Sequence, residues 1–255
     1  MIKGVFFDLY GTLLVMDNPA EGWERWLDRL YDQARRCGYR RSRDELAQRC
    51  EGLFTRPEPA ANDGLTIYES RIAALYGELG LRPAPDDVRA AAEATVNAWN
   101  DRLRLDEDTR EVLSRLGERR RLALITNFDH PPFIPTVLAR MGLDGFFEHV
   151  TISGQVGVKK PDPRIFAPAL GATGLSPDEV VYVGDSVEDV EGAVAAGIAP
   201  IRIERGGVDR SGVIRDYRPD RTAQQLADEY ATDQPARTIA SLSELVSVVD
   251  ELRIK

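Results

Sequence analysis

The chain has 255 residues, of which 43% are hydrophobic, and its formal net charge at pH 7 is −9. This length and composition predict one large domain or two small ones with a real core, and the negative charge argues against nonspecific binding to nucleic acid or anionic membranes. Because Cys37 and Cys50 form no CxxC or disulfide framework and no apolar run is long enough to span a membrane, we expect a cytoplasmic globular protein.

The first element in chain order is a short apolar run, Ile2–Phe7, which is typical of a buried parallel strand. Residues 17–103 contain no comparable run. Helical spacing of apolar side chains follows instead at Trp23, Trp26 and Leu27, and the segments Ile67–Leu79 and Val88–Trp99 are helical in pattern as well. We therefore expect residues 16–104 to form a helical domain inserted after the first strand.

The second half of the chain alternates apolar runs with helical patterns. The expected strands are Leu122–Thr126, Val150–Ser153, Val180–Val183 and, more weakly, Ile201–Ile203, with helices such as Asp108–Leu116 and Asp189–Ala196 between them. This alternation predicts an α/β fold with right-handed βαβ units around a parallel sheet, built from residues 1–15 and 105–255. The charged stretch Gly206–Pro235, with a helical hint at Thr222–Tyr230, is expected to be a functional or mobile loop.

Polar side chains follow the ends of these strands, where open parallel sheets bind their ligands. The first run ends in Asp8, the second in Thr126-Asn127, and the run Val180–Val183 is followed by Gly184-Asp185. The sequence Lys159-Lys160-Pro161-Asp162 comes after the strand near Ile152. An acid, a hydroxyl, a lysine and a second acid are thus expected at one edge of one sheet.

These residue types fit hydrolysis of a phosphate ester. Asp8 would be a nucleophilic carboxylate, and an anion that attacks another anion needs positive charge beside it. Asp185 and Asp189, four residues apart, can complete an oxygen-rich Mg²⁺ site with Asp8. The remaining expected roles are charge neutralisation by a lysine, hydrogen bonds from the Thr126 hydroxyl and from backbone amides near Gly11 and Asn127, and close passage of the backbone at Gly11.

Four stretches, DLYGT, LITN, KKPDP and VGDSVEDVEGA, occur in this order and resemble the four motifs of the haloacid dehalogenase superfamily of hydrolases. The resemblance implies a Rossmann-like core, an α-helical cap domain and an aspartyl-enzyme intermediate. It favours Lys160 over Lys159, because Lys160 adjoins Pro-Asp. By matching position it implies Asp8 as nucleophile, Thr126 as phosphate donor, Lys160 as charge stabiliser, Asp185 and Asp189 as metal acids, and the Tyr10 carbonyl as a further metal ligand.

Position 10 departs from the phosphatase pattern of this superfamily. Phosphatases usually carry there a second Asp that protonates the leaving alcohol, and a phenol with a pKa near 10 is a poor base at neutral pH. The sequence DxYGT resembles the L-2-haloacid dehalogenase branch, whereas Asp185 in GDSVED resembles the phosphatase branch. The side chain of Tyr10 is either catalytic or only a packing residue against the cap.

The dehalogenase branch also has a Ser-Asn-Gly second motif, where this chain has Thr126-Asn127-Phe128, and a cap arginine in a Trp-Arg-x-x-Gln context that this chain lacks. More features therefore oppose the dehalogenase than support it, and we expect Mg²⁺-dependent hydrolysis of a small-molecule phosphomonoester. The first alternative is a metal-free L-2-haloacid dehalogenase, because a halide leaving group needs no proton. The second is a weakened, non-catalytic member that binds a phosphorylated ligand. Substrate selectivity is expected to lie in the helical domain and in residues 206–235.

Overall fold

The apolar runs expected as strands lie together in one parallel sheet of the computed structural model, which describes residues 1–59, 64–206, 225, 228 and 234–252. The strand order within this part of the chain is β5-β4-β1-β6-β7-β8, and every neighbouring pair is parallel. The α/β prediction is therefore confirmed. The strands are β1 Gly4–Phe7, β4 Arg121–Thr126, β5 His149–Ile152, β6 Val180–Gly184, β7 Ala199–Ile203 and β8 Arg237–Ile239.

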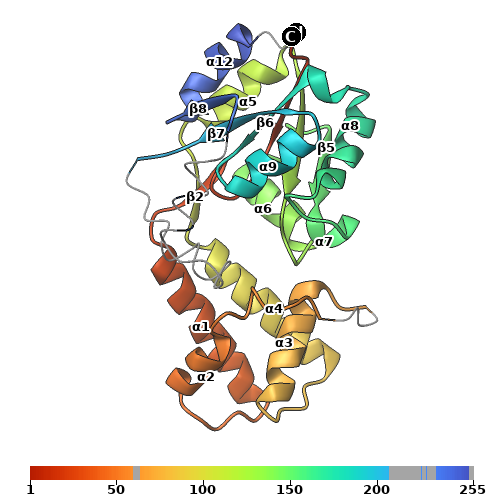
Figure 1. Ribbon diagram of the computed structural model, residues 1–255. Coiled ribbons are helices and arrows are strands. Elements are labelled where there is room, and N and C mark those ends of the chain that lie inside the picture. Colours follow the sequence, from red (N-terminus) through yellow and green to blue (C-terminus); the bar gives the residue numbers. More distant parts are fainter. Residues whose placement is uncertain (60–63, 207–224, 226–227, 229–233, 253–255) are drawn as a thin grey trace. The chain divides into compact units, whose positions relative to one another are not determined.

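Helices cover both faces of this sheet, which explains why its central strands are apolar on both sides (Figure 1). On one face, Phe6, Ile125 and Tyr182 share a buried cluster with Phe166 and Ala193. On the other, α5 packs against β4 and α12 against α5. The elements around the sheet are α5 Thr109–Gly117, α6 Phe133–Met141, α7 Ser153–Val156, η1 Pro163–Phe166, α8 Ala167–Thr173, η2 Pro177–Glu179, α9 Val187–Ala195, η3 Leu242–Glu244 and α12 Leu245–Glu251.

The chain divides into two compact units. The sheet unit contains Met1–Val15 together with residues 104–206 and 234–252, and the helical unit contains Met16–Leu103. The two passages of chain between the units pair as a small two-stranded sheet of β2, Leu14–Met16, and β3, Leu103–Leu105. The sequence did not predict these strands, because three-residue segments are too short to show a period.

The helical unit contains four helices in its described part, each with a recognisable start. They are α1 Pro19–Arg36, α2 Arg43–Cys50, α3 Ile67–Glu78 and α4 Pro85–Asn100. Ser42 and Glu45 form a reciprocal capping pair at α2, and Thr66 and Glu69 do so at α3. Inside the unit, Trp26 Nε1 donates to the Tyr68 hydroxyl over 2.7 Å, so this tryptophan is a core residue.

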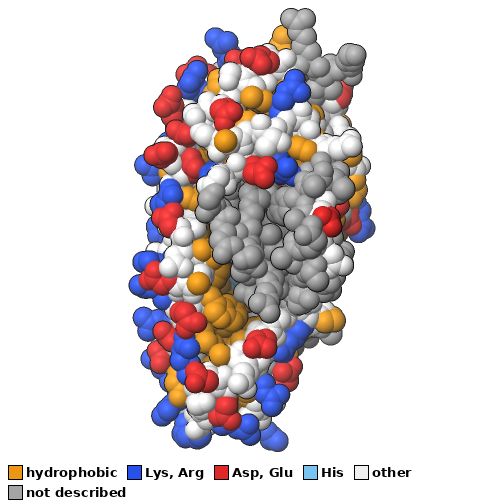
Figure 2. Space-filling model, turned by 60° about the vertical axis from the view of Figure 1, so that its left-hand side comes forward, with side chains coloured by type: hydrophobic (Ala, Val, Ile, Leu, Met, Phe, Trp, Pro, Cys, Tyr) orange, Lys and Arg blue, Asp and Glu red, His pale blue; other side chains and the backbone are white. Residues whose placement is uncertain are grey.

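Charged side chains of both signs are interspersed on the face of the molecule drawn in Figure 2. Among the described residues, no helix combines the length and the apolar character that crossing a bilayer requires. Most of Gly206–Pro235, including the expected helix Thr222–Tyr230, lies outside the described residues.

Candidate active site

Three neighbouring strands place the expected polar residues at one edge of the sheet. Asp8 directly follows β1, and its backbone N–H donates to Val183 O over 2.8 Å, so the pairing of β1 with β6 continues into this residue. Thr126 is the last residue of β4 and is buried, and Asp185 directly follows β6. Because β1 lies between β4 and β6, these residues come together at the crevice where the strand order reverses.

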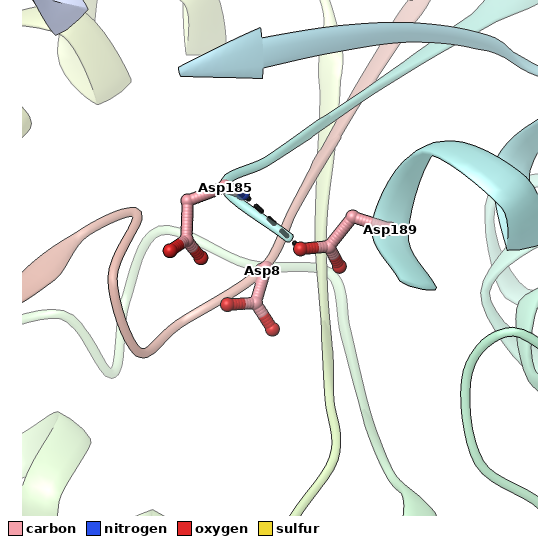
Figure 3. A group of neighbouring side chains, drawn as sticks. All are labelled: Asp8, Asp185 and Asp189. Carbon is pink, nitrogen blue, oxygen red and sulfur yellow. Dashed lines mark hydrogen bonds between the residues drawn. The ribbon is translucent and has the colours of Figure 1, made fainter. Parts of the chain in front are cut away.

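Three carboxylates lie within reach of a single ion at this edge. Asp8, Asp185 and Asp189 each offer one oxygen, and these three oxygens all lie within 4.8 Å of one another (Figure 3). Asp8 and Asp189 are buried, and Asp185 is half-buried. Buried like charges repel strongly at such separations, so the cluster requires a compensating positive charge.

Lys160 provides part of that charge. Its Nζ lies 2.5 Å from Asp8 Oδ1 and 2.6 Å from Asp189 Oδ1, and the side chain is only 4% exposed. A third donor–acceptor contact joins Nζ to the Tyr182 hydroxyl over 3.0 Å. An ammonium group has three hydrogens, so these three contacts use all of them within the protein.

The acids of this cluster differ in their ionisation. Burial raises the pKa of Asp8 to about 8, although the charge of Lys160 acts in the opposite direction. At Asp189, burial also raises the pKa, but the charge and hydrogen bond of Lys160 and the hydrogen bonds of Ser186 outweigh it, so the pKa lies below its ordinary value. Burial lowers the pKa of Lys160, but Asp189 and Asp8 raise it overall.

Both carboxylate oxygens of Asp189 accept hydrogen bonds. Its Oδ1 accepts from Lys160 and lies 3.1 Å from the Tyr182 hydroxyl. Its Oδ2 accepts from the backbone N–H groups of Asp185 and Ser186 over 3.1 and 2.9 Å and from Ser186 Oγ over 2.7 Å. Ser186 caps α9 in return by accepting from Asp189 N, so the helix start and the acid are positioned together.

Two glycines allow the acids to sit this close to the backbone. A Cβ at Gly11, whose φ is +87°, would lie 2.5 Å from both carboxylate oxygens of Asp185, and one at Gly184 would lie 2.3 Å from Asp189 Cγ. The close approach at Gly11 is therefore to Asp185. The Gly11 N–H donates to Leu14 O over 2.7 Å, so in this conformation it is not available to a substrate, contrary to expectation.

Asn127 and Tyr10 flank this centre in ways that the sequence did not predict. The Asn127 side chain donates to Lys160 O over 3.1 Å and accepts from Lys160 N over 2.9 Å, so it fixes the backbone that carries the ammonium. The ring of Tyr10 stacks on Phe128, with centroids 5.3 Å apart and planes 12° apart. Phe128 belongs to the sheet unit, so this stacking supports a packing role for Tyr10 but not the expected packing against the cap.

Two further residues of the site were not among the candidates from the sequence. Tyr182 projects from β6 into the core, and its hydroxyl contacts Lys160, Asp189 and Ile125 O, the last over 2.9 Å. Arg205, which follows β7, donates to the carbonyls of the loop after Asp8. A tyrosine inside the otherwise apolar run VVYVG was the only available signal for Tyr182; Arg205 had none.

The donor set fits a hard divalent cation. Mg²⁺ prefers carboxylate and carbonyl oxygens and is usually bound through one or two carboxylates. Asp8 and Asp185 supply such oxygens. The oxygens of Asp189 already accept the hydrogen bonds described above. Asp189 therefore reaches an ion only by giving up one of them.

Comparison with known proteins agrees with this geometry. Residues 2–197 match the haloacid dehalogenase-like hydrolase family. A glyceraldehyde 3-phosphate phosphatase from Methanopyrus kandleri is 29% identical over 81% of this chain and 85% of its own. The structure of a phosphatase from Thermococcus onnurineus superposes with a TM-score of 0.66 at 25% identity, covering 99% of this chain and all of its own. The structure of a 2-haloacid dehalogenase from Pseudomonas syringae superposes with a TM-score of 0.66 at 22% identity, covering 98% of this chain and 99% of its own. At this identity the similarity shows the fold alone.

Replacement of Tyr182 by Phe is expected to lower the free energy of unfolding by about 1–3 kcal/mol, because its hydroxyl bonds to two charged groups and a carbonyl in the core. Tyr76→Phe is a matched control. Tyr76 is equally buried, and its hydroxyl has no hydrogen-bond partner among the described residues, so its loss should cost nothing. Urea unfolding followed by circular dichroism measures both; equal losses in the two variants would show that the Tyr182 hydroxyl contributes nothing.

Proposed function

Because the chain belongs to the haloacid dehalogenase-like hydrolases, we propose that it hydrolyses a small phosphomonoester with Mg²⁺ bound at the acidic cluster. One observation carries this proposal: one carboxylate oxygen each of Asp8, Asp185 and Asp189 lie within 4.8 Å of one another, and the buried Asp8 and Asp189 share the ammonium of Lys160. The phosphatase names of the relatives support the phosphate ester as substrate class.

In this proposal the carboxylate of Asp8 attacks phosphorus while the bond from phosphorus to the ester oxygen breaks, and the departing alkoxide takes a proton from water. A second water then hydrolyses the aspartyl-phosphate, which releases inorganic phosphate and regenerates the Asp8 carboxylate. Asp8, Asp185 and the carbonyl of Tyr10 would hold Mg²⁺, which when bound would screen the phosphoryl oxygens and stabilise the charge that develops on them. The Thr126 hydroxyl and the backbone at Asn127, both beside Asp8 at the sheet edge, would donate hydrogen bonds to the phosphoryl group.

Lys160 acts on Asp8 in this proposal more than on the substrate. All three of its hydrogens have acceptors within 3.0 Å, namely Asp8, Asp189 and Tyr182. A hydrogen bond to a phosphoryl oxygen would require it to leave one of them. Its contribution is therefore to orient Asp8 and to favour its ionised form.

Asp189 is expected to position Lys160 while Asp8 and Asp185 contact the ion. Its two oxygens accept from Lys160, Ser186 and the backbone of Asp185, and a carboxylate so held is a poor candidate for direct coordination. The sequence prediction that Asp189 is itself a metal ligand stays a prediction, since one of its oxygens lies within 4.8 Å of oxygens of Asp8 and Asp185.

We further propose that the helical unit Met16–Leu103 serves as the cap. Its chain enters through β2, which follows the loop after Asp8 in sequence, and leaves through β3, which pairs with β2. Caps of this kind close over a substrate and exclude water. Selectivity would then reside in the helical unit.

Tyr10 is the observation that favours a second candidate, the haloacid dehalogenase. A halide leaves without a proton, so the lack of an acid at position 10 costs that reaction nothing. Against it stands Asp185, which without a cation would repel both Asp8 and the carboxylate of a haloacid. The charge of the site therefore favours the phosphatase.

The direct test measures phosphate release from p-nitrophenyl phosphate and glyceraldehyde 3-phosphate, and chloride release from 2-chloropropionate, with Mg²⁺ or with chelator. We expect phosphate release that requires Mg²⁺ and that falls about 10²-fold or more in Asp185→Asn, because that residue would hold the ion. The exposed Asp144→Asn is the control and should be unchanged.

Chloride release that is indifferent to chelator would overturn the phosphatase in favour of the dehalogenase. No turnover in either assay, combined with thermal stabilisation by a phosphorylated ligand, would replace both with a binding protein.

Binding of Mg²⁺ at pH 7 should release about one proton per ion. Burial raises the pKa of Asp8 to about 8, so this carboxyl is mostly protonated at pH 7 in the absence of an ion, and a ligand must be deprotonated. Above about pH 9 the Asp8 carboxyl is already ionised before an ion binds, so proton release on binding should fall toward zero. Calorimetric titration in buffers of different ionisation enthalpy measures it, and binding without proton release at pH 7 would contradict the account.

Tyr10→Asp supplies the missing acid and should raise kcat for alkyl phosphates by about 10²-fold, the usual contribution of general acid catalysis. The rate with p-nitrophenyl phosphate should change little, because nitrophenolate leaves without a proton. The ratio of the two kcat values is the measurement. Equal effects on both substrates would show that proton donation to the leaving group does not limit the native protein.

A further inference from the structure

The loop directly after the nucleophilic Asp8 is held by residues that are distant in sequence. Arg205 Nη1 donates to Gly11 O over 2.5 Å, and Nη2 donates to Thr12 O over 2.7 Å. The same guanidinium pairs with Asp106, with Nε 3.0 Å and Nη2 2.9 Å from Oδ2. The side chains of Arg205 and Asp106 are 17% and 12% exposed, so the contact is partly shielded from water.

The next carbonyl of this loop is held from the same direction. Leu13 O accepts from Asp106 N over 3.0 Å and from Thr109 Oγ1 over 3.2 Å. The carbonyls of three successive residues, Gly11, Thr12 and Leu13, thus accept hydrogen bonds from Arg205 or from the segment Asp106–Thr109. All of these residues belong to the sheet unit.

This arrangement constrains the peptide planes on the C-terminal side of Tyr10. The Tyr10 carbonyl is the proposed backbone ligand of Mg²⁺, and its orientation depends on the conformation of the peptide that joins Tyr10 to Gly11. The Gly11 N–H of that peptide donates to Leu14 O, and the Gly11 carbonyl accepts from Arg205. Glycine at this position has wide conformational freedom, so external contacts must restrict it.

We propose that Arg205, oriented by Asp106, is a positioning residue that fixes the loop after Asp8 so that the Tyr10 carbonyl can bind the metal. This inference rests on the proposed function, because it assumes that the metal binds there. Only arginine suits the role, since its planar fork donates to two carbonyls and a carboxylate at once, whereas the single ammonium of lysine cannot match that geometry.

The test uses the full-length protein with Arg205→Lys, which keeps the charge, and Asp106→Asn, which keeps the shape. Arg121→Lys is the matched control, because Arg121 also donates to a backbone carbonyl, that of Thr173, and pairs with Glu148, but at the opposite edge of the sheet. Mn²⁺ affinity is measured by electron paramagnetic resonance of the free ion. Amide hydrogen exchange of residues 9–15 is measured without metal. The kcat with p-nitrophenyl phosphate is measured as a function of Mn²⁺ concentration.

We expect Arg205→Lys to weaken Mn²⁺ binding about tenfold, as for the loss of one charge-assisted hydrogen bond, and to accelerate exchange in residues 9–15. Asp106→Asn should have the same effects in smaller measure. Saturating Mn²⁺ should restore kcat to within about twofold of the native value, which a general loss of stability would not do. Arg121→Lys should match the native protein in all three measurements.

Two failures are distinguishable. Native protein that binds no Mn²⁺ would overturn the proposed metal site and this inference with it. If the native protein binds Mn²⁺ but Arg205→Lys changes neither Mn²⁺ affinity nor amide exchange, the positioning role alone is overturned.

Discussion

The site depends on one electrostatic constraint: oxygens of three carboxylates lie within 4.8 Å of one another at the ends of the strands. Within the described part of the chain, the ammonium of Lys160 lies 2.5 and 2.6 Å from Asp8 and Asp189. Such a cluster is stable when one acid takes up a proton or when a cation enters. The raised pKa of Asp8 reflects the first state, and the oxygen-rich donor set suits the second. In the proposed function the same groups would couple ion binding to ionisation of Asp8.

The strands and loops around the site bring its charged groups close together. The strand ends β4, β1 and β6 bring Thr126, Asp8 and Asp185 together, and Gly11 and Gly184 leave room for two of the acids. Tyr182 and Asn127 hold Lys160 by its ammonium and by its backbone. At position 10 this chain differs from the phosphatase pattern while keeping the phosphatase charge at position 185. In the proposed function, acids that hold an ion without the usual proton donor would suit substrates whose leaving groups depart without assistance.

The parts of the fold that the sequence predicted are those with strong local signals. Strands β1, β4 and β6 are buried on both faces and are therefore continuous apolar runs, and the chemistry-bearing residues follow their ends directly. Strands β2, β3 and β8 have three residues each and show no period. The role of Arg205 was not predictable, since its acceptors lie more than 190 residues earlier in the chain. The same holds for Tyr182, which looks like one more core residue until its hydroxyl is placed beside Lys160.

The most direct test of the central claim is anomalous diffraction from crystals soaked in Mn²⁺, a stand-in for Mg²⁺ with a measurable signal. The account predicts one peak in contact with carboxylate oxygens of both Asp8 and Asp185, with Lys160 still bonded to Asp189. A crevice without a peak at saturating Mn²⁺, or a peak that touches neither acid, would contradict it.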